Sequence, residues 1–320
     1  MPAVTTDGRL VLYYADRSTS PPRTLVTASA DGLTFPPAQQ PDGWAHDPRR
    51  VHLPDGTWRR YLAEPEFPGD PSSGMVFRSE SSVDGLAFTR DQGVRYRPPA
   101  ADNGSIGVYD TFVDGDGGTV ILYIGDMGGP TASVRRAYSP PGDNGWSFHF
   151  EGDVLGRYGA GRGNNHVDPK SLPLPDGRRR LFTMYQGPQP PLPGVRAVGR
   201  IASFVTADGG RTFQLEDGWR LQPEDFPDLR VWSLNDPWVV RLPDGRYRMY
   251  VAALITAEDG TPEPVILSAT SGGDALPDMP PGIAPDDWTS PAWTYPESVP
   301  NDVMQAAAVV ELARRAAPPP

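Results

Sequence analysis

The sequence predicts an all-β fold, a five-bladed β-propeller whose four-stranded antiparallel blades surround a central funnel. The first observation is an internal repeat: an Asp-Pro pair, Asp-Gly seven residues after the Pro, and then a strand rich in Tyr and Arg. It occurs in WAHDPRRVHLPDGTWRRYLAE (44–64), NNHVDPKSLPLPDGRRRLFTMYQG (164–187) and SLNDPWVVRLPDGRYRMYVAA (233–253). The second observation is composition, since 35 Gly and 39 Pro are too many for long helices and suit short strands ended by turns.

The third observation is the spacing of the leading aspartates. Asp47, Asp110, Asp168 and Asp236 follow one another at intervals of 63, 58 and 68 residues. A period of ~60 residues with about four strands is typical of propeller blades. The N-terminal PAVTTDGRLVLYYA forms a fifth unit without the leading Asp, so we expect a single domain over 1–320. Residues 300–320 fit either a closing strand or a short helix, followed by a Pro tail.

A second recurring element joins the outer strands of the units. It reads SADGLTF (29–35), SVDGLAF (82–88) and TADGGRTF (206–213). In such turns Ser or Thr and Asp side chains cap backbone N–H groups, and Gly supplies a positive φ. We therefore expect a structural role for Asp31, Asp84 and Asp208.

Composition excludes several classes of protein. The 38% of hydrophobic residues is enough for a packed core. A net charge of −11 argues against a nucleic-acid partner, whose phosphates need basic patches, and no apolar run reaches the roughly 18 residues of a membrane span. Cys is absent, which excludes disulfides and thiolate metal sites. No signal peptide is visible, so both a cytoplasmic protein and a secreted one with its signal removed remain open, and we expect a monomer.

The Asp-Pro positions predict where the chemistry lies. In a propeller the first strand of each blade lines the channel, so Asp47, Asp110, Asp168 and Asp236 would converge in one funnel, with Pro at the first strand residue. Gathered carboxyl groups differ in pKa, which supplies the acid and the base of glycoside hydrolysis. The alternative is that each Asp only caps neighbouring amides. Asp110 fits the pattern least well, because Thr111 replaces the Pro.

Histidines and aromatic residues flank these aspartates. His46 and His166 stand one and two residues before their Asp, which suits hydrogen bonds to a substrate or ligation of an axial Ca²⁺ or transition-metal ion. No cofactor is expected to be required. Aromatic side chains near the same positions would stack on the faces of a carbohydrate substrate: Trp44, Tyr109, Trp232 and Trp238.

These segments resemble the five-bladed propeller glycosidases, that is, family 43 arabinanases, β-xylosidases and arabinofuranosidases, and the invertase-like enzymes. HDPRRVHLPDGTWRRYLA resembles the first inner strand of that family, and the resemblance implies that Asp47 is the general base. HVDPKSLPLPDGRRRLFTMYQG resembles the third-blade segment, which implies that Asp168 tunes the pKa of the acid and orients the sugar. The turn motifs also resemble the Asp boxes of sialidases, although no spacing of arginines marks a carboxylate-binding triad.

The chain departs from the family at the general acid. The fourth blade of the family begins with a Glu, whereas the matching stretch here is SLNDPWVV, with Asp236 and no Glu. The acid would then be Asp236 or Glu64, or it is missing. The leading hypothesis is an inverting glycoside hydrolase acting on a neutral arabinofuranoside or xyloside. The alternatives are a non-catalytic carbohydrate-binding propeller and a sialidase-like or metal-dependent enzyme, and a correctly placed acid would distinguish the hydrolase from the binding protein.

Overall fold

The computed structural model describes most of the chain between residues 2 and 271, together with one later strand. The described residues are 2–4, 9–16, 23–37, 40–41, 49–85, 87–127, 129, 131–158, 166–174, 176–186, 199–242, 246–257, 260–271 and 294–298. The closing segment at 300–320 lies outside them. No helix in the described parts is long and apolar enough to cross a membrane.

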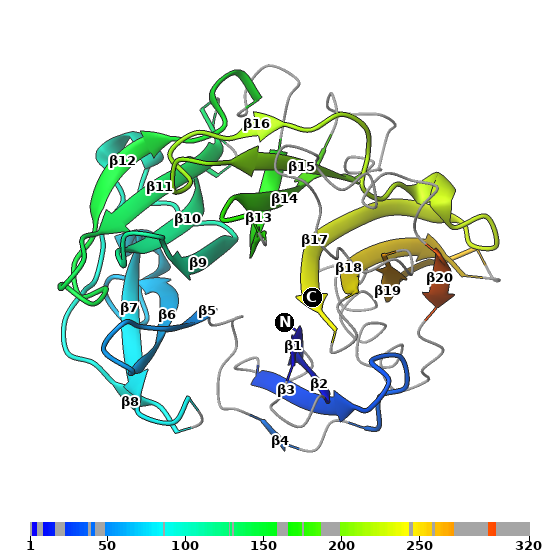
Figure 1. The fold of residues 1–320 in the computed structure, drawn as a ribbon, viewed down its shortest axis with the longest axis horizontal. Helices are drawn as coiled ribbons and strands as arrows, with labels where there is room; N and C mark the ends of the chain where they lie inside the picture. The colour runs from blue at the N-terminus through cyan, green and yellow to red at the C-terminus, as the bar shows by residue number, and fades with distance from the viewer. Residues whose placement is uncertain are drawn as a thin grey trace. The chain divides into compact units, whose positions relative to one another are not determined.

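The described strands form five four-stranded antiparallel sheets, each built from consecutive strands (Figure 1). The first contains β1 (Pro2–Val4), β2 (Leu10–Asp16), β3 (Arg23–Ser29) and β4 (Gln40–Pro41). The second contains β5 (Arg49–His52), β6 (Trp58–Pro65), β7 (Met75–Ser82) and β8 (Thr89–Arg90). The third contains β9 (Tyr109–Val113), β10 (Thr119–Gly125), β11 (Ser133–Ser139) and β12 (His149–Asp153).

The fourth sheet contains β13 (His166–Pro173), β14 (Arg179–Tyr185), β15 (Arg200–Thr206) and β16 (Gln214–Leu215). The fifth contains β17 (Val231–Arg241), β18 (Tyr247–Thr256), β19 (Pro262–Thr270) and β20 (Thr294–Ser298). Four short 3₁₀ helices lie in the described connections: η1 (Pro71–Ser73), η2 (Ala100–Asp102), η3 (Gly156–Tyr158) and η4 (Pro223–Asp225). Consecutive four-stranded meanders are the blades of a β-propeller, so the predicted fold class is confirmed.

The Asp-Gly pairs of the repeat form the predicted hairpin turns. Gly56 has a φ of 84°, and the turn is closed by the Leu53 N–H donating to the Thr57 oxygen at 2.8 Å. Gly177 has the same φ, which a residue with a Cβ adopts only under strain. The third pair, Asp244-Gly245, lies outside the described residues.

The second recurring element forms side-chain-capped turns, as predicted. Asp31 Oδ1 accepts hydrogen bonds from the backbone N–H groups of Leu33 and Thr34, both at 2.8 Å, and from Ser29 Oγ. The same pattern holds at Asp84 and Asp208. Burial raises the pKa of Asp208, but hydrogen bonds from Thr206, Thr212 and Arg211 outweigh it and lower the pKa to about 2. These aspartates therefore hold turns.

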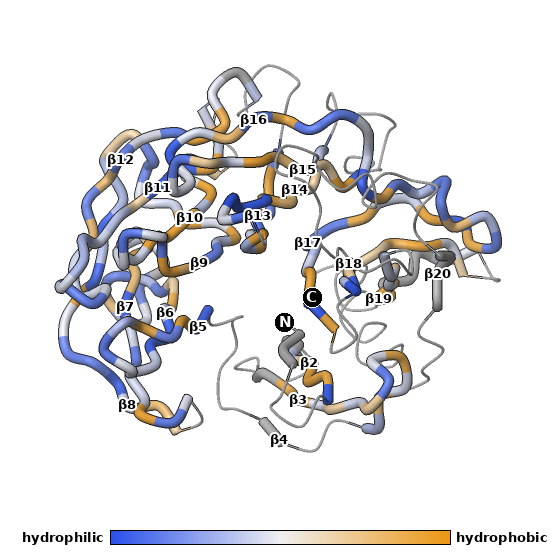
Figure 2. Tube along the Cα trace, in the orientation of Figure 1, coloured by the Kyte–Doolittle hydropathy of each residue, from blue (hydrophilic) through white to orange (hydrophobic). Residues whose placement is uncertain are grey.

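Two compact units divide the chain. One comprises residues 1–47, 197–202 and 217–320, and the other comprises 48–196 and 203–216. Hydrophobic cores lie between neighbouring sheets in both units. Strands such as β10, in which every residue is buried, contribute side chains to these cores (Figure 2). In the first unit, Leu10, Leu12 and Phe35 of the N-terminal sheet pack with Val240 and Tyr250 of the C-terminal sheet. The single domain expected over 1–320 stays a prediction.

Candidate active site

The Asp-Pro pairs lie at identical irregularities in the first strands of two sheets. The pairing register shifts between Val167 and Lys170 in β13, and between Asn235 and Trp238 in β17. Each shift encloses an Asp-Pro pair: Asp168-Pro169 in β13 and Asp236-Pro237 in β17. Two residues then oppose one, which is the definition of a β-bulge.

Both aspartates have left-handed backbone. The φ of Asp168 is 55° and that of Asp236 is 47°. This conformation costs a residue with a Cβ about 1–2 kcal/mol of conformational free energy, and among such residues Asp and Asn adopt it most readily. The expectation that Asp-Pro precedes the strand is wrong, because both pairs lie within their strands. Pro is tolerated there because a bulge leaves its missing N–H outside the ladder.

Asp110 differs from these aspartates in register and backbone conformation, while its predicted place in a shared funnel stays a prediction. It stands seven residues before the hairpin Gly117, whereas Asp168 stands nine before Gly177. Asp110 pairs regularly with Leu122 in β10, and no bulge interrupts β9. The position of β13 that matches Asp110 by this register is Lys170.

Asp110 is instead tied to β13. Its Oδ2 accepts hydrogen bonds from the Ser171 N–H at 2.7 Å and from Ser171 Oγ at 2.6 Å. The residue is 7% exposed. Burial raises the pKa of Asp110, and the charge of Arg49 and the bonds from Ser171 oppose this rise only in part. Asp110 is therefore a buried carboxyl group between two strands.

Two cations meet at one backbone oxygen beside it. The Tyr109 oxygen accepts a hydrogen bond from Arg49 Nε at 2.9 Å and one from Lys170 Nζ at 3.1 Å. Both cationic residues are buried. Sequence reasoning missed Lys170 and Ser171 as contributors to this region. The available signal was that Lys170, the single lysine of the chain, directly follows Asp168-Pro169.

His166 lies among aromatic rings rather than in solvent. It is 4% exposed, and its Nδ1 is 2.9 Å from Thr183 Oγ1. Its ring centroid lies 4.9 Å from that of Phe204 and 5.1 Å from that of Tyr185. Burial lowers the pKa of His166 to about 4, so the imidazole is neutral at pH 7.

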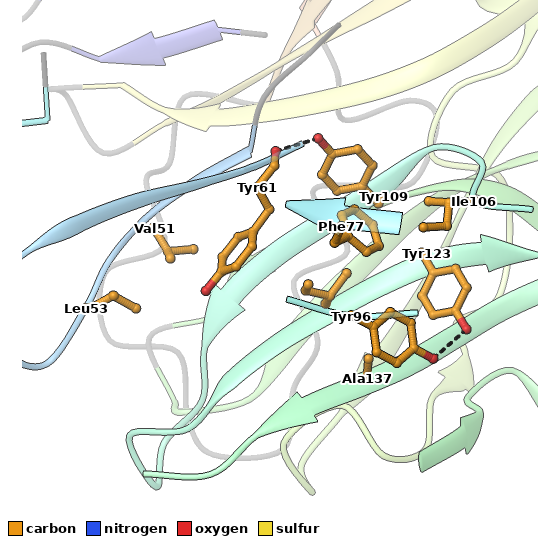
Figure 3. Close-up of a cluster of buried hydrophobic side chains, with 10 residues drawn as sticks. Val51, Leu53, Tyr61, Phe77, Tyr96, Ile106, Tyr109, Tyr123 and Ala137 are labelled. Atoms are coloured by element: carbon orange, nitrogen blue, oxygen red, sulfur yellow. Dashed lines mark hydrogen bonds between the residues drawn. The ribbon is translucent and has the colours of Figure 1, made fainter. Parts of the chain in front are cut away.

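The candidate stacking residues have different surroundings. Tyr109 is 7% exposed, and its ring centroid lies 4.8 Å from that of Phe77. Its hydroxyl donates to the backbone carbonyl oxygen of Tyr61 at 2.7 Å (Figure 3). Tyr109 thus belongs to the core and offers no face to a sugar. Trp238 packs against a second core, whereas Trp232 is 39% exposed and its indole N–H donates to Thr256 Oγ1.

Glu64 lies in β6 and is held by arginines. Arg90 Nη1 donates to its Oε1 at 2.8 Å and Arg90 Nη2 binds its Oε2, while Arg78 Nε is 3.7 Å from Oε2. Trp44, His46 and Asp47 lie outside the described residues. Among those described, no group of three or more His, Cys, Asp or Glu side chains is arranged to hold a metal ion. The predicted convergence of Asp47, Asp168 and Asp236 stays a prediction.

Comparison with solved structures supports the fold. A thermostable family-43 glycoside hydrolase matches with a TM-score of 0.55 at 13% identity, covering 88% of this chain and 96% of that one. An endo-arabinase from Bacteroides thetaiotaomicron matches with a TM-score of 0.52 at 14% identity, covering 70% and 74%. A GH32 β-fructofuranosidase from Bombyx mori matches with a TM-score of 0.56 at 12% identity, covering 84% and 59%.

At these identities the likeness concerns the fold alone. No protein-family model and no curated protein sequence matches the chain. The chain is thus an all-β propeller of four-stranded antiparallel blades, a fold that it shares with glycosidases.

Proposed function

We propose that this protein is a glycoside hydrolase that acts on a neutral furanoside or pyranoside through its Asp-Pro carboxylates. Asp47 is the general base, and Asp168 orients the sugar and tunes the pKa of the acid. Asp236 is the general acid, a role for which it is preferred to Glu64 because that carboxylate is engaged by Arg90. Inversion at the anomeric carbon is expected, with room for a water between acid and base.

The matched bulges of β13 and β17 carry this proposal. Asp168 and Asp236 both have left-handed backbone, and they occupy the same register in the first strands of two sheets. The same unfavourable conformation thus occurs at two matching positions. Such strain persists where the surroundings impose it, and it is concentrated at functional sites. The fold shared with glycosidases supports a carbohydrate substrate, and the net charge of −11 disfavours anionic sugars.

The second candidate function is carbohydrate binding without catalysis. The observation that favours it is the acid position, where Asp236 stands in place of the Glu of the family that the sequence resembles. A carboxylate at that place would then only accept hydrogen bonds from sugar hydroxyls, and the exposed Trp232 would supply a stacking surface.

A panel of chromogenic glycosides tests the proposal. We expect turnover of an α-L-arabinofuranoside, a β-xyloside or a β-fructofuranoside after EDTA treatment, with inversion seen by NMR of the first product anomer. Asp47→Asn, Asp168→Asn and Asp236→Asn should each lower kcat/KM at least about 100-fold, the usual contribution of a positioned acid or base. Asp126→Asn is the matched control, since Asp126 has a φ of 50° but belongs to no Asp-Pro pair.

The outcomes separate the candidates. Sugar binding by calorimetry without turnover on any glycoside would favour the binding protein. Turnover only after addition of a transition metal would favour the metal-dependent enzyme. Full activity in the Asp168→Asn and Asp236→Asn variants would refute the assignment of these residues.

A further inference from the structure

The bulge in β13 is followed directly by two ties to β9. Directly after Asp168-Pro169, Lys170 Nζ donates a hydrogen bond to the backbone carbonyl oxygen of Tyr109 at 3.1 Å. The next residue, Ser171, donates both its N–H and its hydroxyl to one oxygen of Asp110, at 2.7 and 2.6 Å. The two strands thus hold each other at consecutive residues. We call this set the β9–β13 clamp: Tyr109, Asp110, Lys170 and Ser171.

The clamp is buried and charged, which makes its geometry stiff. Asp110 and Lys170 are both less than a tenth exposed. Hydrogen bonds to a charged group in a low-dielectric interior are shorter and stronger than those in water. One further contact comes from outside the clamp. Arg179 Nη1 donates to Ser171 Oγ at 3.1 Å, so that oxygen accepts from Arg179 while its hydroxyl donates to Asp110.

The bulge of β17 lacks the side chains that form this clamp. The positions that match Lys170 and Ser171 there are Trp238 and Val239, which carry no charged group and no hydroxyl. Asp236 nevertheless has nearly the same φ as Asp168. The clamp is therefore not required to form an Asp-Pro bulge. It adds something specific to the strand that bears Asp168.

We propose that Asp110, acting through Ser171, is a positioning residue that fixes where the bulge of β13 presents the Asp168 carboxylate. This inference rests on the function proposed for Asp168, which needs a defined orientation toward the sugar. Asp110 touches no substrate in this account. Its regular strand conformation and its place in an uninterrupted ladder distinguish it from Asp168, which lies in a bulge with left-handed backbone.

The test compares three variants of the clamp with one control. Asp110→Ala removes the acceptor, Ser171→Ala removes one of its two donors, and Asp110→Asn retains an acceptor oxygen. Ser72→Ala is the matched control, because the Ser72 N–H and hydroxyl donate in the same way to one oxygen of Asp70, at 2.9 and 2.5 Å, in the exposed η1 turn.

Two readouts are measured on each purified full-length variant. The first is kcat and KM on the best glycoside. We expect Asp110→Ala to lower kcat about 10- to 100-fold with KM changed by less than about twofold, as misplacement of a reacting group does. Ser171→Ala should lower kcat less, Asp110→Asn should recover most of the loss, and Ser72→Ala should leave kcat unchanged.

The second readout is the ¹³C carboxyl resonance of Asp168, assigned from its loss in Asp168→Asn and followed against pH. Asp110→Ala should shift this resonance and its titration midpoint, whereas Ser72→Ala should leave both in place. Unchanged Asp168 titration in Asp110→Ala would overturn the proposal, as would an equal loss of kcat in Asp110→Asn. If the wild-type protein turns over no glycoside, the proposed function fails while the carboxyl titration still decides the clamp. If Asp110→Ala does not fold, the comparison of Ser171→Ala with Asp110→Asn decides it.

Discussion

Burial determines what the histidine of the third repeat segment can do. His166 was a candidate for substrate contact or metal ligation from its place two residues before Asp168. In the structure its ring is enclosed by Tyr158, Tyr185 and Phe204, and Thr183 holds its Nδ1. An imidazole in such surroundings is costly to protonate, because burial removes it from water and none of the carboxylates in the described residues compensates the charge.

His166→Gln tests this environment. The folded-state pKa of about 4 lies below the ordinary 6.5, so the contribution of His166 to stability is full above pH 6.5 and is lost as the pH falls through 4. Over that window the wild type should lose up to about 3 kcal/mol more than His166→Gln, which has no titrating group at this place. Urea unfolding of both proteins between pH 7 and pH 4 measures the difference. Parallel pH profiles would contradict the assignment of a neutral buried histidine.

Asp110 illustrates a limit of alignment by residue type. Its spacing along the chain fits the repeat and predicts that it matches the Asp-Pro aspartates. The strand register places it two residues later than they are, opposite Leu122 and in regular strand conformation. An aspartate can therefore match a repeat in sequence and differ in conformation, since Asp168 lies with Pro169 in a bulge and Asp110 lies in a regular ladder.

The same pair of contacts between a strand and a turn occurs twice, and we call each pair a latch: an Arg and a Tyr two residues apart on the strand bind two consecutive backbone oxygens of the turn. In β6, Arg59 binds the Asn144 oxygen and Tyr61 donates to the Gly145 oxygen at 3.0 Å. In β18, Arg248 donates to the Asp31 oxygen at 2.5 Å and Tyr250 to the Gly32 oxygen at 2.6 Å. Both glycines have positive φ, 68° and 70°, and a Cβ on either would lie within 3 Å of its tyrosine hydroxyl.

Tyr61→Phe and Tyr250→Phe test whether the two latches are equivalent. Each change removes one buried hydrogen bond and leaves a carbonyl without its donor, so each should lower the unfolding free energy by about 1 kcal/mol. The two losses should add in the double variant, because the latches lie in different cores. Chemical denaturation of the three variants measures this. A neutral Tyr61→Phe beside a costly Tyr250→Phe would show that the latches differ.

At the scale of the whole molecule, three capped turns in the described residues share an electrostatic feature. Asp143 caps its turn as Asp31 and Asp208 do, accepting hydrogen bonds from Ser139 Oγ at 2.6 Å and from the Ser147 N–H at 2.7 Å. The pKa of all three aspartates is lowered: burial alone would raise it, and hydrogen bonds from the turn prevail. Protonation of these carboxyl groups weakens the acceptors on which the turns depend. Acid should therefore destabilise several sheets together.

Asp208→Asn measures how much one capped turn contributes to the pH dependence of stability. The pKa of Asp208 falls from 3.8 to about 2 on folding, so its contribution is present above pH 3.8 and is lost as the pH falls through 2. We expect Asp208→Asn to have a lower Tm than the wild type at pH 6, with the gap closing as the pH falls toward 2. Calorimetry at a series of pH values checks this. A constant gap would mean that the carboxylate charge does not matter to the turn.

The sequence alone predicts what depends on local chemistry. Gly after Asp specifies the hairpin turns at Gly56 and Gly177, Ser or Thr with Asp specifies the capped turns, and three copies of the repeat imply similar sheets. The five four-stranded sheets follow from these signals, because turn geometry and strand length are set within a few residues.

Only the tertiary structure decided how residues far apart in the chain meet. The β9–β13 clamp joins Asp110 to Ser171, and the first and last sheets share the core of Leu10 and Tyr250. Burial then sets the neutral state of His166 and places the ring of Tyr109 in a core. Hydrogen bonding and desolvation act between neighbours in space, so single-sequence spacing carries no signal for them.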